Sequence, residues 1–237
     1  MPSNIHSSYP PDTLLATIDD ACIYGRDLDV LESPKAWLTA SCLLGAMRKR
    51  RRTDTSENLW MDPSVVSFLV GQCHDEDDLR DFRAGYGNFQ GVRRILCPIN
   101  DVFGAKNQWA TPGAGTHWSL LWIEVTEGEK VCFWHADSVA SRPNGRAARA
   151  VATKWAQVLS ASEDMTIQNL EVPLQENGYD CGVHVLAAME ESVHCGHPRE
   201  LETRLWDAMR EGASVYCREL RRSVAVDIRM LAEKRCD

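Results

Sequence analysis

The sequence has no run of about 18 consecutive apolar residues, which argues against a membrane-spanning helix. Its first residues, MPSNIHSSYPPD, lack the basic and apolar segments of a secretory signal, so we expect a cytoplasmic and/or nuclear protein. It contains no CxxC pair, which disfavours a zinc ribbon, and no internal repeat. Basic residues are in deficit, with 26 Lys and Arg against 34 Asp and Glu, so nucleic acid and membrane surfaces are poor candidate partners.

The chain has 237 residues and 44% hydrophobic content, which is enough for one domain with a substantial core. We expect residues 1–12 to be a flexible tail and residues 13–237 to be a single, monomeric domain. Most of the nine cysteines lie in apolar runs, as expected for reduced, buried thiols. The run RKRRR, Arg48 to Arg52, is either a nuclear-import signal or a solvated helix end, and the second interpretation is favoured because cations suit a helix C-terminus.

Apolar periodicity gives a coarse map of the secondary structure. It predicts helices at 13–21, 37–47, 63–70, 144–159, 181–193 and within 200–234, and strands at 92–99, 117–125, 130–135 and 166–172. Helices come first, then strands, a helix, a strand and helices again. This order favours an α+β architecture over a doubly wound parallel sheet.

The stretch LQENGYDCGVHVLAAME places Cys181 at the start of a predicted helix, directly after an Asn177-Gly178 turn. A catalytic thiol must ionise near neutral pH, whereas an ordinary cysteine has a pKa of about 8.5. The partial positive charge of a helix N-terminus favours the thiolate, and Gly182 would let a substrate backbone approach closely. The alternative is that Cys181 is a small buried hydrophobe, as we expect for the other eight cysteines.

A histidine and an aspartate lie where they could activate this thiol. His117 stands at the loop-to-strand junction GTHWSLL, and Asp137 ends the paired strand in FWHADS. The start of one strand and the end of the next meet at one end of an antiparallel hairpin. Asp137 could therefore orient His117, whose other ring nitrogen would face Cys181. His135 could compete for Asp137, although the favoured interpretation is a half-buried sheet histidine.

Further polar residues near these motifs are candidate site residues. Gln175, in the loop before Cys181, is a candidate oxyanion donor through its side-chain amide. Asp180 would simply cap the helix. Asn100, where a long loop towards His117 begins, is a candidate substrate-binding residue.

In their order and neighbours, GTHWSLL, FWHADS and PLQENGYDCG resemble the SUMO/sentrin-specific protease family, the ubiquitin-like-protein proteases. The resemblance spans about residues 13 to 195 and is strongest to the short deneddylating member. It implies a papain-like α+β fold, with a central mixed or antiparallel sheet flanked by helices and the catalytic cysteine at a helix N-terminus. It implies a cysteine peptidase, without a cofactor, that cuts after the Gly-Gly end of a ubiquitin-like modifier in precursors and/or conjugates. The expected modifier is of the Nedd/Rub type first and SUMO second.

The resemblance also implies a diglycine tunnel between two indoles, Trp118 after the catalytic histidine and Trp37 in the first helical segment. Only glycines fit between two indoles, so this selectivity is steric; the alternative for both residues is core packing. One departure concerns the residues after Trp37-Leu38. The family usually has Asn-Asp there, whereas this chain has Thr39-Ala40, which puts the identity of the modifier in doubt.

Three other functions remain open at this stage. An acetyltransferase of the same fold would need a basic pocket for a phosphorylated cofactor, and RKRRR is the only basic cluster. A non-catalytic modifier-binding module would explain Ala40 but not an intact catalytic set. A metal site at His194, Cys195 and His197 lacks a distant partner pair.

Overall fold

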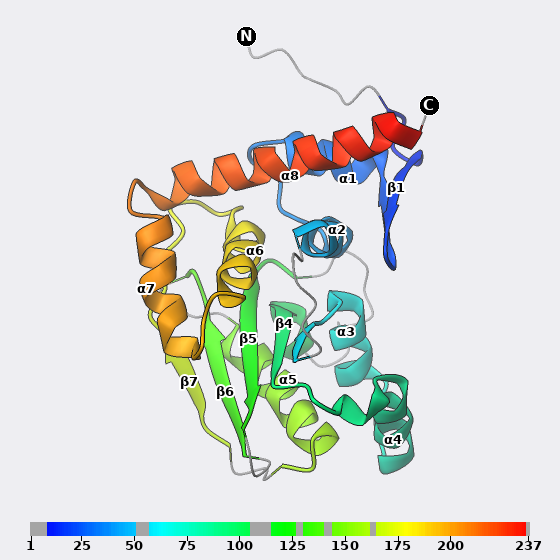
Figure 1. Cartoon of the computed structure of the whole chain (residues 1–237), viewed down its shortest axis with the longest axis vertical. Coiled ribbons are helices and arrows are strands. Elements are labelled where there is room, and N and C mark those ends of the chain that lie inside the picture. Colours follow the sequence, from blue (N-terminus) through cyan, green and yellow to red (C-terminus); the bar gives the residue numbers. More distant parts are fainter. Residues whose placement is uncertain are drawn as a thin grey trace.

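Figure 1 shows the computed structural model of the chain. The structure describes residues 9–50, 57–104, 115–126, 130–139, 144–161 and 165–235. Most of the predicted tail at residues 1–12 therefore lies outside the described residues. Its last part is hydrogen-bonded to the domain, since Pro10 accepts from the Thr13 amide (3.0 Å) and Pro11 from the Arg26 amide (2.9 Å).

The chain folds into the α+β architecture that the sequence predicts, although it begins with two strands and not with a helix. The elements are β1 (Leu14–Ile18), β2 (Ala21–Tyr24), α1 (Gly25–Glu32), α2 (Ala40–Arg50), β3 (Asn58–Trp60), α3 (Pro63–Gly71), α4 (Glu76–Gly85), η1 (Gly87–Phe89), β4 (Arg94–Asn100), η2 (Asp101–Gly104), β5 (Trp118–Val125), β6 (Val131–Ala136), α5 (Gly145–Val158), β7 (Ile167–Leu170), α6 (Cys181–Ser192), α7 (Pro198–Ala208) and α8 (Ala213–Arg235).

The central sheet has five strands in the order β3-β4-β5-β6-β7. Its inner pairs β4–β5 and β5–β6 are antiparallel, and its outer pairs β3–β4 and β6–β7 are parallel. The sheet is therefore mixed, as predicted. Because β5 and β6 form a hairpin, the residue before β5 and the residue after β6 lie at the same end of the sheet.

Helices cover both faces of the sheet. Successive side chains of a strand point to opposite faces, so one strand packs against helices on both sides. On β5, Leu120 and Trp122 pack on the side of α6, and Leu121 and Ile123 pack on the side of α5. Helix α8 runs across one end of the molecule over α1 and α2 (Figure 1). None of the helices in the described part of the chain has the length and apolar character that crossing a membrane requires.

Two predicted helices near the N-terminus differ from the structure. Residues 13–21 are not helical but form the β1–β2 hairpin, which Asp19 turns with a φ of 51°. Aspartate tolerates this left-handed conformation, and a residue in this conformation cannot continue a right-handed helix. The predicted helix at 37–47 begins only at Ala40, because the Thr39 hydroxyl accepts from the Cys42 amide (3.2 Å) and caps it. Trp37 therefore lies in the segment before α2.

Elsewhere the predicted helices and strands are present within a few residues of their expected bounds. Asp62 caps the helix that begins at Pro63, since its side chain accepts from the Ser64 amide. Helix α4 is absent from the map that apolar periodicity predicts. It follows His74 in an acidic segment and buries Leu79 and Phe82.

Candidate active site

Cys181 is the first residue of α6, and the residue is only 1% exposed. The preceding residue, Asp180, does not cap the helix with its side chain, so that prediction is wrong. The Asp180 carboxylate instead accepts from the Asn177 side-chain amide (2.8 Å) and pairs with Arg221 (3.4 Å). These contacts fix the conformation of the loop before Cys181 and therefore the position of its sulfur.

Arg221 is a structural residue that the sequence did not reveal. It lies on α8, is 4% exposed, and donates to the backbone oxygens of Val30 (3.1 Å) and Ser33 (3.3 Å) as well as to Asp180. One buried guanidinium thus joins the end of α1 to the loop before Cys181. A charged residue in a helix with mixed charge gives no sequence signal of such a role.

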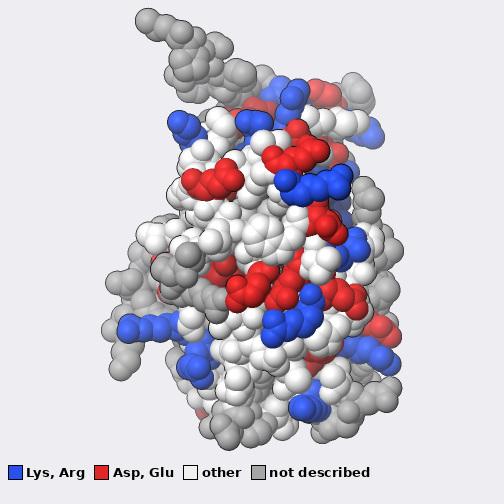
Figure 2. Space-filling view, turned by 90° about the vertical axis from the view of Figure 1, so that its left-hand side faces the viewer, with Lys and Arg blue, Asp and Glu red and all other residues white. Residues whose placement is uncertain are grey.

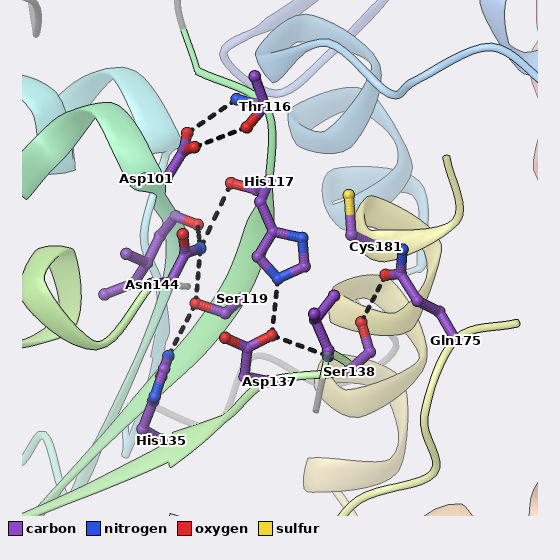
Figure 3. A network of polar contacts seen from close by, with 12 residues as sticks. Asp101, Thr116, His117, Ser119, His135, Asp137, Ser138, Asn144, Gln175 and Cys181 are labelled. Atoms are coloured by element: carbon purple, nitrogen blue, oxygen red, sulfur yellow. Dashed lines mark hydrogen bonds and ion pairs between the residues drawn. The ribbon is translucent and has the colours of Figure 1, made fainter. Parts of the chain in front are cut away.

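His117 and Asp137 meet at one end of the β5–β6 hairpin, as the hairpin argument predicts. His117 Nε2 lies 2.6 Å from Asp137 Oδ1, and both side chains are buried. The same carboxylate oxygen accepts from the backbone amide of Val139 (3.0 Å). Figure 3 shows the ring of His117 between Asp137 and Cys181.

The surroundings of His117 favour its charged form. Burial lowers the pKa of His117, but hydrogen bonds and charge interactions with Asp137 and Cys181 outweigh burial and raise that pKa to about 9. By contrast, burial raises the pKa of the Cys42 and Cys217 thiols to about 12. Burial thus favours the protonated form of these two thiols at neutral pH, which disfavours them as nucleophiles.

Gln175 lies beside the same site and its amide is oriented by two neighbours. Its backbone amide donates to the Ser138 carbonyl (2.8 Å), and the Ser138 hydroxyl donates to Gln175 Oε1 (2.8 Å). Gln175 Nε2 donates to the Asn177 carbonyl (2.5 Å). One N–H of the amide is thus engaged, and its other N–H is the group that a developing oxyanion could use.

The two predicted tunnel residues lie against each other and against the site. The indoles of Trp37 and Trp118 stack with centroids 5.5 Å apart and planes inclined by 20°. Trp118 Nε1 donates to the Leu38 carbonyl (2.8 Å), and Trp37 Nε1 donates to Cys181 Sγ (3.0 Å). The contact between an indole and the sulfur was not expected from the sequence.

The other two predicted substrate-binding residues have structural contacts. A Cβ placed on Gly182 would lie 2.9 Å from the Cβ of Leu38, so Leu38 fills the space where a side chain at this position would begin. Asn100 is buried and its side-chain oxygen accepts from the Val102 amide (3.1 Å), which holds the turn after β4. Substrate contact by these two residues remains a prediction.

The packing of Leu38 on Gly182 predicts the effect of a substitution. Gly182→Ala would force backbone or side-chain shifts against a fully buried leucine, and we expect it to lower the free energy of unfolding by about 1–3 kcal/mol in urea denaturation. Gly85→Ala is the matched control, because a Cβ there meets nothing within 4 Å. Equal stability of the two variants would contradict the tight contact.

The second histidine of the hairpin belongs to a buried polar cluster. His135 Nε2 lies 2.8 Å from the Ser119 hydroxyl, which accepts from Asn144 Nδ2 (2.9 Å). Asn144 Nδ2 also lies 3.3 Å from the His117 carbonyl, so this cluster supports the backbone of the histidine that faces Cys181 (Figure 3). His135 is buried rather than half-buried, and it is not the ring that lies next to the sulfur.

The metal site considered at His194, Cys195 and His197 gains no support from the structure. Among the described residues, no three or more His, Cys, Asp or Glu side chains gather where they could hold a metal ion. His197 instead caps α7, with Nδ1 accepting from the Arg199 amide (3.1 Å).

The basic run has a structural role. Arg48 pairs with Asp20 (2.6 Å) and Arg50 donates to Ser223 (2.6 Å), and their side chains are only 9% and 16% exposed. A solvated helix end is therefore wrong for these two arginines, and residues 51 and 52 lie outside the described residues. On the face carrying α7, acidic and basic side chains are interspersed (Figure 2). The described part of this face therefore does not show the basic patch that an acetyltransferase would need to bind a phosphorylated cofactor.

Comparisons with known proteins agree with the geometry. Residues 88–225 match the model of the Ulp1 protease family, C-terminal catalytic domain. Sentrin-specific protease 8 of Mus musculus is 41% identical over 184 residues, which cover 76% of this chain and 77% of that protein. NEDD8-specific protease 1 of Arabidopsis thaliana is 26% identical over 176 residues, 74% of each chain. The fold also matches the Ulp1 protease domain solved in complex with Smt3, the yeast ortholog of SUMO, with a TM-score of 0.66, 21% identity, and coverage of 96% and 91%.

Proposed function

Because the chain belongs to the Ulp1 protease family and is a cysteine peptidase, we propose that it hydrolyses the bond after the C-terminal diglycine of a ubiquitin-like modifier. The observation that carries this proposal is the buried His117–Asp137 pair at 2.6 Å, whose ring faces the sulfur of Cys181 at a helix start. Trp37 and Trp118 lie beside that sulfur and stack on each other, so a substrate tail without side chains would displace the two indoles least.

A NEDD8-type modifier is the preferred substrate in this proposal. One relative is named as a NEDD8-specific protease, and another as a sentrin-specific protease. Thr39 and Ala40 stand where the resembling family usually has Asn-Asp, so this chain recognises the modifier tail without that carboxylate. SUMO is the second candidate modifier, and ubiquitin is the third.

Acylation follows from the arrangement of the site. The Cys181 thiolate attacks the carbonyl carbon of the terminal glycine, and the oxyanion is held by Gln175 Nε2 and the Cys181 backbone N–H. The imidazolium of His117, stabilised by Asp137, gives its proton to the leaving amine. The C–N bond breaks, and a thioester and a neutral imidazole remain.

Deacylation returns the site to its resting state. Neutral His117 takes a proton from a water molecule, whose oxygen attacks the thioester carbon. The second oxyanion collapses, the C–S bond breaks, and the modifier leaves as a carboxylic acid, which gives its proton to solvent and becomes a free carboxylate. The products are the thiolate and imidazolium that began the cycle, so no cofactor or redox step is required.

The test is cleavage of a panel of modifiers that end in diglycine, each fused to a reporter or joined to a lysine by an isopeptide bond. We expect the NEDD8-type substrate to be cleaved fastest, and a matched fusion ending in dialanine to resist cleavage because two methyl groups do not fit between the indoles. Faster cleavage of SUMO would change the substrate and keep the chemistry. If the folded wild-type protein cleaves none of the panel, the proposal fails.

The oxyanion role of Gln175 makes a separate prediction. Gln175→Ala should lower kcat about 100-fold or more, because it removes a donor that acts in the transition state, with little change in KM. Ser138→Ala leaves the amide in place but removes one of the two hydrogen bonds that orient it, so we expect a loss of roughly tenfold, smaller than that of Gln175→Ala. Steady-state kinetics on one fusion measures both, and an unchanged kcat for Gln175→Ala would exclude this role.

A further inference from the structure

Three groups converge on the sulfur of Cys181, and one of them has no place in the mechanism above. The start of α6 and the ring of His117 are two of them. The third is the indole of Trp37, whose Nε1 donates to Cys181 Sγ at 3.0 Å. The wall of a steric tunnel requires only the face of this indole, yet its N–H points at the reacting atom.

The chemistry of this contact distinguishes the two states of the sulfur. An indole N–H is a donor only, and a neutral thiol is a weak acceptor. A thiolate is a charged acceptor, and hydrogen bonds to charged groups are about twice as strong as neutral ones. The bond from Trp37 therefore stabilises the thiolate more than the thiol.

We propose that Trp37 is a catalytic residue whose indole N–H stabilises the Cys181 thiolate in the free enzyme. The proposal rests on the proposed function only in taking Cys181 as the nucleophile. Trp37 and His117 then act together on one sulfur, the first as a neutral donor and the second as a cationic one. Unlike the histidine, the indole keeps its proton throughout the cycle.

The fold holds the indole in the orientation that this role needs. Trp118 stacks on its face at 5.5 Å and donates to the carbonyl of Leu38, the next residue in the chain. The side chain of Leu38 is fixed against Gly182, the residue after Cys181. The backbone of the donor is thus packed directly on the helix turn that carries the acceptor.

The test is the pH dependence of the alkylation of Cys181 by iodoacetamide, followed by mass spectrometry of the peptide that carries this residue. Trp37→Phe keeps an aromatic ring for the stack and removes the N–H together with part of the indole bicycle, so its control must be another Trp→Phe substitution. We expect its alkylation midpoint to move up by about one pH unit, the size of one charge-assisted hydrogen bond. Trp206→Phe is the matched control, since it removes an indole N–H that donates to the Glu171 carbonyl and not to the sulfur, and it should keep the wild-type midpoint.

The same peptide map contains its own controls. The exposed Cys22 should titrate identically in all three proteins, and the fully buried Cys217 should stay unreactive wherever the fold is intact. A wild-type midpoint in folded Trp37→Phe, or an equal shift in Trp206→Phe, would overturn the proposal. No modifier is used, so the thiolate role stands or falls separately from substrate cleavage.

Discussion

Cys181→Ala is expected to abolish turnover, lowering kcat on a diglycine-ended fusion by on the order of 10⁴- to 10⁶-fold. The nucleophile forms the covalent intermediate, and the other groups of the site act on that intermediate or on its formation. Without the sulfur, His117 and Gln175 have no tetrahedral thiol adduct to protonate or to stabilise. Any activity that remains would come from an oxyanion site and bound substrate alone.

The variant should fail in chemistry and not in binding. Cys181→Ala removes only the buried thiol at the start of α6 and leaves the indoles of Trp37 and Trp118 in place. The modifier should therefore still bind, which calorimetry or fluorescence anisotropy would measure. Cys22→Ala is the matched control, since Cys22 is an exposed thiol on β2. Residual turnover within tenfold of wild type in Cys181→Ala would require a different nucleophile and would end the present mechanism.

The sequence was most informative where local rules dictate geometry. An antiparallel hairpin brings the start of one strand beside the end of the next, and this alone predicts the meeting of His117 and Asp137. The position of Cys181 at a helix start follows from a turn and an apolar stripe. Both are short-range or single-hairpin arguments, which depend little on the rest of the fold.

Contacts between distant segments could not be predicted in this way. The Trp37 indole reaches Cys181 from 144 positions away, and Arg221 reaches Asp180 from the last helix. Nothing in a helical or alternating pattern says which segments of the chain pack together. Gly182 shows the same limit. A glycine is needed there because the distant residue Leu38 packs against it, and no neighbour in its own helix indicates this need.

The hairpin at the N-terminus shows a second limit, which concerns competing local signals. The apolar residues between Leu14 and Ala21 fit helical spacing, but the turn at Asp19 and the pairing of β1 with β2 decide the outcome. Segments this short satisfy both periodicities, so tertiary pairing wins over spacing. The functional interpretation was unaffected, because none of the catalytic candidates lies in this hairpin.

Asp137→Asn is expected to lower kcat roughly 10³- to 10⁴-fold while leaving the hairpin intact. Oδ1 of Asp137 receives both the His117 ring and the Val139 amide, so an asparagine can keep its carbonyl oxygen there. It then loses the negative charge that stabilises the imidazolium. It also places an NH₂ at the position of Oδ2, which is buried and has no hydrogen-bond partner among the described residues. The loss of activity thus measures the effect of the negative charge of Asp137, because the oxygen that accepts from His117 is retained.

The same substitution has a pH signature in stability. The pKa of His117 is raised from 6.5 to about 9 in the folded protein, so the folded state binds a proton more tightly than the unfolded state. This contribution is fully present below pH 6.5 and is lost as the pH rises through 9. Wild type should therefore exceed Asp137→Asn in free energy of unfolding most strongly near pH 6, and the difference should shrink towards pH 10. Urea denaturation across that range measures it, and a difference that does not change with pH would mean that Asp137 does not stabilise a charged His117.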